Sequence, residues 1–452
     1  MGYRRSDTSR TSLYDAERIA RGREQLDKSQ CYLLDMDQTL ARYRTPAVYE
    51  LVHRALLSFM VDNKGYPAAL KEVAFEPGFC LKGLVFDTET GDVLKIDEHG
   101  AICRARHGFA APFLTQEQVK AKYPGGLWPK FQKMVNRERG DFFLFNTLFD
   151  VPVALVCARL VDNEDASRES RDAKGHQAAY AFLPHLFEAL EHTYGPPAFG
   201  ERRGLFFPSL LASPSTFLWK RPRVTSWLQA EKAKGRNLFL VTNSQVDFSE
   251  FIMQESFGAD WRALFDGIVF FARKGKGFFE LPAVKTPFFR LKNDTRGLAC
   301  GESVCPGGGA ANELGEAAPT LEMGGEYLQG HHSLMSGWLG HDPSNTTYFG
   351  DHLMADVKAV RDCTSWQAVA VVSELRAREP SEDALGATWG DFFSCDSNDA
   401  AEQPGGGGGV GGGAEGGGGW TRSFLGSVAE DLAVVCLADM DDLCPGFESD
   451  TA

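Results

Sequence analysis

Short apolar runs alternate with helical patterns along much of the chain. The runs are four to six residues long and rich in residues that favour β-strands. The expected strands are residues 31–34, 237–241, 267–271, 346–349 and 367–372, and the expected helices are residues 47–62, 224–233 and 248–257. Strands that alternate with helices in this way form parallel sheets, so we expect an α/β core.

The stretch between the first two expected strands has a different pattern. Residues 68–150 contain short strand-like runs and turns, and residues 151–195 are expected to be helical. Glycine dominates residues 403–419, which is typical of a flexible linker. The predicted division is a polar extension at 1–29, a core at 30–44 and 219–395, an inserted mixed module at 45–218, and a Gly-rich linker with an acidic tail at 396–452.

The composition is that of an enzyme-sized globular protein. Of the 452 residues, 43% are hydrophobic, which is enough for at least one large core. The formal net charge of −14 argues against broad binding to nucleic acid or to anionic lipid. No apolar run approaches the ~20 residues of a membrane span, and residues 1–30 lack the apolar run of a signal peptide. We therefore expect no nucleic-acid or membrane partner. Acidic residues among the arginines of the start favour a cytoplasmic over a mitochondrial location.

Two carboxylates follow directly on the first expected strand. Asp35 and Asp37 stand at the carboxyl end of the run at 31–34, where open α/β sheets bind ligands. Side chains two residues apart on an extended strand share a face. Two carboxylates in one site form a negative pocket that favours a divalent cation, and their hard oxygen atoms suit Mg²⁺.

The second expected strand also ends in polar residues. Thr242, Asn243 and Ser244 follow the run at 237–241. Hydroxyl and backbone N–H groups at a strand-to-helix turn suit phosphate oxygens. The alternative is that these residues only cap the following helix.

A third strand end carries further carboxylates. The strand at 346–349 ends in Gly350 and Asp351, and Asp356 follows on a helical turn. Asp351 would supply a further carboxylate for the metal, with Asp356 as a partner behind it. The alternative is that Asp351 lies in a simple turn after glycine.

These three motifs, in this order, resemble the catalytic set of the haloacid dehalogenase superfamily. Within it, the segments DMDQTL, VTNS and YFGDHLMAD are similar to those of the cytosolic purine 5′-nucleotidase family. The likeness runs from about residue 30 to residue 395. It implies a doubly wound parallel α/β core with a large mixed α+β cap inserted after the first motif.

The resemblance also implies phosphoryl transfer in two steps. Asp35 would attack the substrate phosphorus and form an aspartyl phosphate, while Asp37 would protonate the leaving oxygen and then activate water. The implied site has Mg²⁺ ligands at Asp35, Asp37 (through its backbone carbonyl) and Asp351, phosphate-binding residues at Thr242, Asn243 and Ser244, and a supporting carboxylate at Asp356.

The chain departs from the family pattern at one position. The superfamily uses a lysine between the second and the last motif. In the purine nucleotidases it lies in a turn that here corresponds to residues 296–301, which contain no lysine. Lys274 and Lys292 are candidate substitutes, and Lys274 stands closer to a strand end. Without this charge, the orientation of Asp35 and the stabilisation of the phosphate would both be weaker.

The favoured function is a Mg²⁺-dependent phosphohydrolase, a 5′-nucleotidase acting on nucleoside 5′-monophosphates. One alternative is a nucleotide- or phosphate-binding protein of the same fold with weak or no catalysis, because of the unplaced lysine. Another is a protein phosphatase, although the inserted module would crowd a peptide away from the site. The oligomeric state, a homo-oligomer included, stays open.

Overall fold

The computed structural model describes residues 16–169, 180–291, 315–318, 320–375, 385–395 and 421–444. The chain divides into two compact units. The first unit comprises Met1–Val73, Leu186–Glu382 and Val428–Ala452, and the second comprises Ala74–His185 and Asp383–Ser427. Within the described ranges, every helix is too short or too polar to span a lipid bilayer.

A nine-stranded sheet forms the centre of the first unit. Its order is β15 (Val435–Leu437), β12 (Gln367–Val371), β11 (Thr346–Gly350), β1 (Cys31–Leu34), β6 (Asn237–Val241), β7 (Gly267–Phe270), β10 (Gly325–Gln329), β8 (Phe288–Leu291) and β9 (Gly315–Ala318). The strands from β15 to β10 are parallel, and β8 pairs antiparallel with both β10 and β9. All five predicted strands are confirmed, and so is a mixed α/β fold with a mainly parallel sheet.

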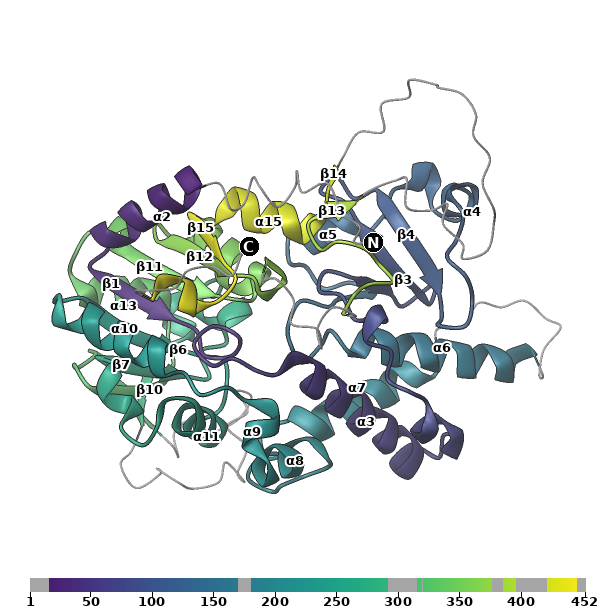
Figure 1. Cartoon of the computed structure of the whole chain (residues 1–452), viewed down its shortest axis with the longest axis horizontal. Coiled ribbons are helices and arrows are strands. Elements are labelled where there is room, and N and C mark those ends of the chain that lie inside the picture. The colour runs from purple at the N-terminus through teal and green to yellow at the C-terminus, as the bar shows by residue number, and fades with distance from the viewer. Residues whose placement is uncertain are drawn as a thin grey trace, which may run out of the picture. The chain divides into compact units, whose positions relative to one another are not determined.

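Strand β1 has the central place in this sheet. Leu34 pairs with Phe349 of β11 on one side and with Leu240 of β6 on the other. Figure 1 shows β1, in purple, beside the green strand β11, although the two are far apart in the sequence. Every residue of β1 is buried, which explains its continuous apolar run. The strands that follow β1 in the sequence add to both sides of it: β6 and β7 on one side, and β11 and β12 on the other. Strand β1 therefore lies at a topological switch point, where the strand order reverses.

Helices alternate with the strands of this sheet along the chain. The helices of the first unit are α2 (Ala16–Lys28), α3 (Thr45–Lys64), α8 (Phe206–Ala212), α9 (Pro214–Phe217), α10 (Pro222–Ala233), α11 (Val246–Phe257), α13 (His332–Leu339) and α14 (Ala359–Cys363). Two π-helical turns, η5 (Lys274–Phe278) and η9 (Leu353–Lys358), follow β7 and β11. Helix α3 has Pro46 in its first turn and ends at Gly65, whose φ of 72° allows the left-handed cap. The three predicted helices are confirmed as α3, α10 and α11.

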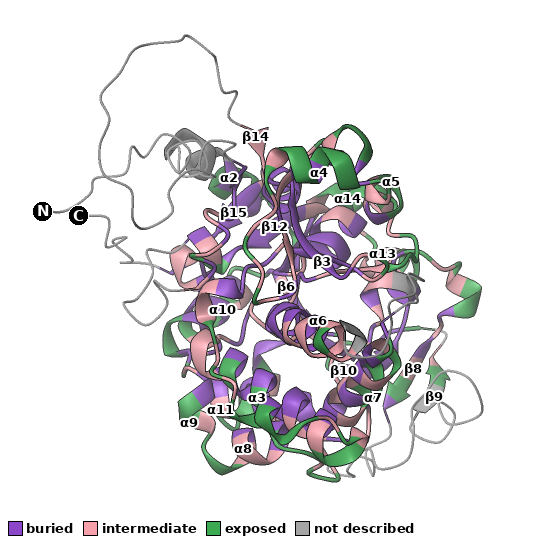
Figure 2. Cartoon of the chain, turned by 90° about the vertical axis from the view of Figure 1, so that its right-hand side faces the viewer, coloured by how far each residue is buried: buried purple, intermediate pink, exposed green. Residues whose placement is uncertain are grey.

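The second unit contains a four-stranded antiparallel sheet. Its order is β4 (Ile102–His107), β3 (Asp92–Ile96), β2 (Val85–Asp87) and β5 (Phe142–Leu144). Its helices are α4 (Gln116–Lys122), α5 (Phe131–Val135) and α6 (Val153–Glu169), and a small second sheet pairs β13 (Ser394–Cys395) with β14 (Thr421–Arg422). The remaining helices, α7 (Phe182–Tyr194) and α15 (Phe424–Leu432), contain the points at which the chain passes between the units. In Figure 2, strands β6 and β12 are buried, whereas α4 is largely exposed.

Short 3₁₀ turns complete the described structure. They are η1 (Ala68–Glu72), η2 (Pro77–Phe79), η3 (Pro124–Gly126), η4 (Trp261–Leu264), η6 (Ala283–Lys285), η8 (Pro343–Asn345), η10 (Ser373–Leu375) and η12 (Met440–Leu443).

The last described residues of the chain take part in the central sheet. Residues 435–437 form β15, which pairs in parallel with β12 and extends the sheet by one strand. Arg221 and Asp439 form a buried ion pair that holds the turn after β15. The strand lies within an apolar run at 432–438, and the acidic residues around this run led to its prediction as part of the tail. The predicted domain limits at 45 and 218 stay a prediction, since the compact units change at other positions.

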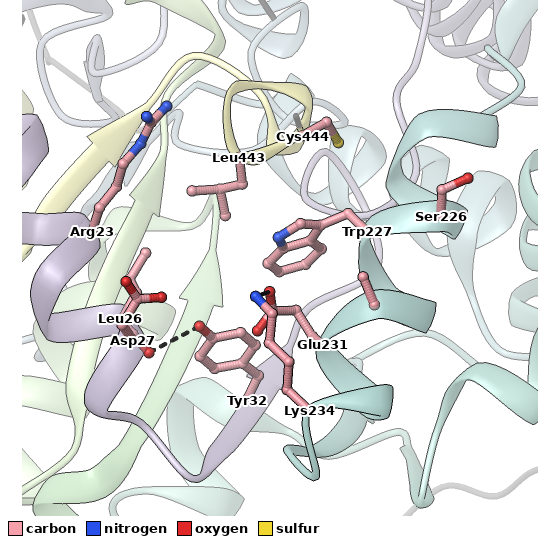
Figure 3. A pocket seen from close by; sticks show the side chains of 11 residues that line it. Arg23, Leu26, Asp27, Tyr32, Ser226, Trp227, Glu231, Lys234, Leu443 and Cys444 are labelled. Carbon is pink, nitrogen blue, oxygen red and sulfur yellow. Dashed lines mark hydrogen bonds and ion pairs between the residues drawn. The ribbon is translucent and has the colours of Figure 1, made fainter. Parts of the chain in front are cut away.

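A pocket of about 490 Å³ lies in the first unit and contains none of the predicted site residues. Figure 3 shows it between α2, α10 and the residues that end η12. On its wall, the ring of Trp227 stacks on that of Tyr32, with the ring centres 5.8 Å apart. The predicted site residues lie at the carboxyl ends of the central strands, away from this pocket.

Candidate functional site

The candidate site lies at the carboxyl ends of β1, β6 and β11. Asp35 follows β1 directly, and its backbone N–H donates to the carbonyl of Phe349 on the neighbouring strand. Because parallel strands end at the same edge of a sheet, Asp351 after β11 and Thr242 after β6 come to this edge as well. The fold thus brings together three segments that the sequence keeps far apart.

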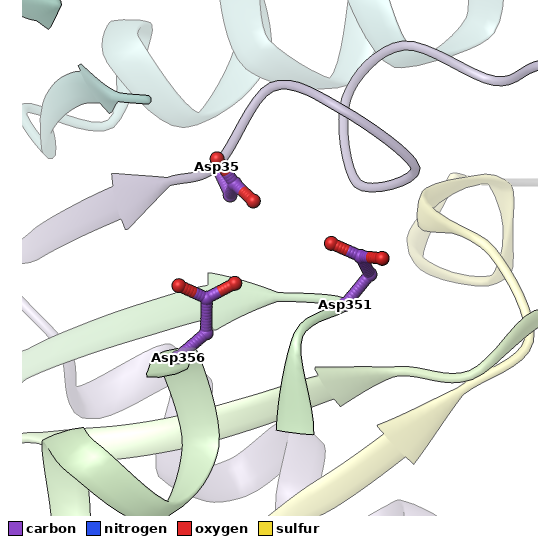
Figure 4. Close-up of side chains that lie close together, drawn as sticks. All are labelled: Asp35, Asp351 and Asp356. Atoms are coloured by element: carbon purple, nitrogen blue, oxygen red, sulfur yellow. The ribbon is translucent and has the colours of Figure 1, made fainter. Parts of the chain in front are cut away.

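Three buried carboxylates gather at this edge. One oxygen each of Asp35, Asp351 and Asp356 lies within 4.8 Å of the others. Figure 4 shows Asp35 at the end of β1, Asp351 at the end of β11, and Asp356 on the helical turn that follows. Glycine at position 350 permits this approach, because a Cβ there would lie 2.4 Å from the Cβ of Asp356. Such a set of oxygen atoms fits Mg²⁺.

Lys274 lies among these carboxylates. Its Nζ is 2.7 Å from Asp35 Oδ1 and 2.8 Å from Asp356 Oδ1. The lysine begins the π-helical turn η5, a rare element that is frequent at functional sites. Just before it, Phe271 and Arg273 have φ values of 46° and 56°, a left-handed conformation that is uncommon outside glycine. This bend directs the chain after β7 toward Asp35. Lys292 and residues 296–301 lie outside the described residues.

Three carboxylates surround one ammonium group at Asp35, so negative charge is in excess. Burial raises the pKa of the Asp35 carboxyl well above its usual range; Lys274 opposes this rise, and Asp356 and Asp351 add to it. Burial lowers the pKa of the Lys274 ammonium, but Asp35 and Asp356 outweigh that effect, so the pKa lies well above its usual value. Lys274 is therefore charged, and the neighbourhood of Asp35 favours a further cation.

The carboxylate of Asp37 is held by two hydroxyl groups. Tyr43 donates a hydrogen bond of 2.5 Å to Oδ1, and Ser244 donates one of 2.7 Å to Oδ2. Burial raises the pKa of Asp37, and these two hydrogen bonds partly offset the rise. Asp37 keeps some exposure, whereas Tyr43 is buried.

The residues after β6 form a tight turn before α11. The hydroxyl of buried Thr242 accepts the backbone N–H of Ser244 at 3.0 Å, and exposed Asn243 accepts the backbone N–H of Lys274 at 2.8 Å. Asn243 therefore connects the turn after β6 to the turn after β7. Ser244 lies against Asp37, so the second motif and the first are in contact.

Comparison with known proteins assigns the family. Residues 23–380 match the model of the 5′ nucleotidase family. The chain belongs to the 5′ nucleotidase family. It is 31% identical over 353 residues to human (Homo sapiens) 5′-nucleotidase domain-containing protein 1, an alignment that covers 76% of this chain and 72% of the human one. It is 30% identical over 388 residues to the protein of the same name from cattle (Bos taurus), covering 79% and 80%.

Membership of the 5′ nucleotidase family confirms the predicted relationship and the predicted enzyme class. The chain is a phosphoric monoester hydrolase-like enzyme with a nucleotidase-like function. The match begins before β1 and ends after β12, so it includes every predicted site residue from Asp35 to Asp356.

Sequence patterns did not identify Tyr43, and they did not decide whether Lys274 or Lys292 takes the place of the family lysine. Tyr43 stands six residues after Asp37, beyond a turn, where no strand or helix period relates the two side chains. Lys274 and Lys292 both lie between the second and third motifs, and only the geometry after β7 places one of them beside Asp35. A signal for Lys274 was its position just after a predicted strand.

Proposed function

We propose that this member of the 5′ nucleotidase family is a Mg²⁺-dependent phosphohydrolase that acts on nucleoside 5′-monophosphates through an aspartyl-phosphate intermediate. The observation that carries the proposal is the contact of Lys274 with Asp35 and Asp356, beside Asp351 at a switch point of the sheet. A buried nucleophile, a fixed ammonium and a cation-binding set of carboxylates are the parts that phosphoryl transfer needs.

Each residue then has a distinct part. Asp35 attacks the phosphorus in line with the leaving oxygen, and Lys274 orients Asp35 and neutralises charge on the phosphate. Asp37 protonates the leaving nucleoside oxygen and afterwards takes a proton from the water that cleaves the aspartyl phosphate. Thr242 and the backbone N–H groups before α11 bind phosphate oxygens, while Asn243 and Ser244 fix the surrounding turns.

Mg²⁺ is the metal that we propose for the carboxylates. Asp35, Asp351 and the backbone carbonyl of Asp37 would hold it, and Asp356 would steady Lys274 behind them. When bound, the ion offsets the repulsion between an anionic nucleophile and an anionic substrate.

The finer fold assignment belongs to the same proposal. A central switch-point strand that ends in the nucleophile supports a doubly wound haloacid dehalogenase-like core, with residues 45–218 as the inserted cap. A cap that closes over the phosphate would exclude water. We also propose a cytoplasmic location, and nucleoside monophosphates as the small-molecule substrates.

The position of Lys274, whose Nζ lies 2.7 Å from Asp35, supports the enzyme over the binding-protein alternative, which was motivated by the unplaced family lysine. That alternative remains an outcome of the experiment, as does a protein phosphatase.

The test is phosphate release from a panel of nucleoside monophosphates, simple phosphate esters and a phosphopeptide, with and without Mg²⁺. We expect Mg²⁺-dependent release from nucleoside monophosphates and a loss of at least about a thousandfold in Asp35→Asn. Asp92→Asn, which changes a buried carboxylate in the second unit, is the matched control and should keep the chemistry. Release from the phosphopeptide alone would favour a protein phosphatase, and no release by folded protein would overturn the proposed enzyme.

A further inference from the structure

We propose that Tyr43 is a positioning residue that fixes the carboxylate of Asp37 for proton transfer to the leaving group. The proposal rests on the function proposed above. Nothing in the pattern of the three motifs assigns a part to this tyrosine. The assignment depends on three contacts in the first unit: the hydrogen bonds to Asp37, the chain crossing at Tyr43, and the anchor of the intervening turn.

The hydrogen bonds leave Asp37 little freedom. Tyr43 donates to Oδ1 at 2.5 Å and Ser244 donates to Oδ2 at 2.7 Å, so each oxygen has its own donor from a different segment. Two donors on the two oxygens fix the plane of a carboxylate as well as its position. A general acid must be within hydrogen-bond reach of the leaving oxygen, and a displacement of about 1 Å can cost a hundredfold in rate.

Tyr43 itself is held by a crossing of two chain segments. It forms an antiparallel bridge with Leu218, where the chain returns before α10. The backbone N–H of Arg44 donates to Phe217 at 2.8 Å, and that of Trp219 donates to Arg42 at 3.0 Å. The crossing is further fixed because the guanidinium carbon of Arg44 lies 3.4 Å from the centre of the Trp219 ring. The segment after the first motif is thus tied to residues 217–219.

The turn between Asp35 and Tyr43 has its own anchor. Arg221 Nε donates to the carbonyl of Leu40 at 3.1 Å, and the same guanidinium pairs with Asp439 after β15. Leu40 and Ala41 in turn donate their backbone N–H groups to Asp35 and Met36. Because this turn is fixed at both ends, the buried hydroxyl of Tyr43 has a defined place, and its own burial keeps it from the substrate. It acts through Asp37.

The experiment compares two substrates that differ in their need for a general acid. One is the nucleoside monophosphate that the wild type cleaves fastest, whose leaving alkoxide must be protonated; the other is p-nitrophenyl phosphate, whose leaving group departs without a proton. We expect Tyr43→Phe to lower kcat/KM for the nucleotide by about tenfold, and to change kcat/KM for p-nitrophenyl phosphate by less than about threefold. The comparison uses kcat/KM because this constant ends with departure of the leaving group and does not include the later hydrolysis of the aspartyl phosphate, in which Asp37 acts on both substrates alike.

Tyr32→Phe is the matched control. Tyr32 is also a buried tyrosine of the first unit, but its hydroxyl donates to the carbonyl of Leu26. The control should leave the ratio of the two kcat/KM values unchanged. Equal losses of kcat/KM on both substrates in Tyr43→Phe would overturn the proposal, because a merely structural tyrosine would affect both reactions alike.

The wild-type rates separate this proposal from the proposed function. A wild type that cleaves neither substrate would overturn the phosphohydrolase and with it the part of Tyr43. A wild type that cleaves both, together with an unselective Tyr43→Phe, would overturn the part of Tyr43 alone. If Tyr43→Phe does not fold, Trp219→Leu loosens the same crossing and keeps the hydroxyl; we expect a smaller loss, again confined to the nucleotide, and an equal loss on both substrates would again contradict the proposal.

Discussion

Two buried carboxylates, Asp35 in the first unit and Asp92 in the second, have opposite surroundings. Asp92 accepts hydrogen bonds of 2.8 Å from each of His107, Lys122 and Tyr123. Burial alone would raise its pKa, but these partners outweigh it and the pKa lies below the usual value. The carboxylate of Asp92 is satisfied by the protein itself.

Asp35 is also buried, but the charges around it are mainly negative. Burial raises its pKa well above the usual range; Lys274 opposes this rise, and Asp356 and Asp351 add to it. A buried carboxylate that accepts enough hydrogen bonds stabilises the fold. Where buried carboxylates outnumber the neighbouring cations, the site is suited to bind a metal and to react with a phosphate. This difference predicts how two clusters of side chains respond to mutation, to Mg²⁺ and to pH. The Asp35 cluster consists of Asp35, Asp351, Asp356 and Lys274, and the Asp92 cluster consists of Asp92, His107, Lys122 and Tyr123.

The largest expected effect on stability comes from Lys274→Met without Mg²⁺. Removing the ammonium leaves Asp35 and Asp356 buried without their partner, so the free energy of unfolding should fall by about 3–5 kcal/mol. Phosphate release should also fall by at least about a hundredfold, since Lys274 no longer orients Asp35. Urea unfolding monitored by tryptophan fluorescence measures the first effect, and the phosphate assay measures the second.

Lys122→Met is the control for this variant in the other cluster. About a third of the Lys122 side chain is exposed, and Asp92 keeps His107 and Tyr123 as donors. We therefore expect a loss of no more than about 1 kcal/mol. Equal losses in the two variants would remove the distinction between the clusters.

The second prediction concerns Mg²⁺ itself. Because the neighbourhood of Asp35 is negative, Mg²⁺ at about a hundred times its dissociation constant should stabilise the protein by about 2.7 kcal/mol. The rise in melting temperature should disappear in Asp351→Asn and persist in Asp92→Asn. Differential scanning calorimetry over a Mg²⁺ titration measures it. An unchanged rise in Asp351→Asn would show that the ion binds elsewhere.

The sequence predicted the centre of the fold better than its edges. Strands β1, β6, β7, β11 and β12 are short, mostly apolar runs rich in residues that favour strands, because parallel strands are buried on both faces. Strands β8 and β15 were not predicted. Phe288–Leu291 has an exposed arginine that interrupts its pattern, whereas Val435–Leu437 lies in an apolar run at 432–438 that acidic residues surround. Their places in the sheet depend on pairing with distant strands, which local pattern does not record.

The candidate site shows the same division. Asp35, Thr242 and Asp351 each follow a predicted strand, so the common edge of a parallel sheet was enough to bring them together. Tyr43 reaches Asp37 only through a crossing with Leu218, and Lys274 reaches Asp35 only through a left-handed bend after β7. Contacts of this kind arise from tertiary structure and have no local period.

The smallest expected effect is the pH dependence of the Asp92 cluster. His107 lies between Asp92 and Asp165, with both ring nitrogens 2.8 Å from a carboxylate oxygen and Lys122 nearby. The hydrogen bond that His107 donates to Asp92 raises the pKa of His107, although burial opposes it. A raised pKa in the folded state means that the stabilisation is complete below the unfolded pKa of about 6.5 and is lost as the pH rises through the folded value.

Between about pH 6 and about pH 9, the second unit should lose less than about 1 kcal/mol, since a third of the His107 side chain is exposed to solvent. Urea unfolding at both pH values should show this loss in the wild type and a smaller one in His107→Gln, which keeps a hydrogen-bond donor but does not titrate. Equal losses in the two proteins would mean that His107 is not the source, and that the Asp92 cluster holds together without its charge.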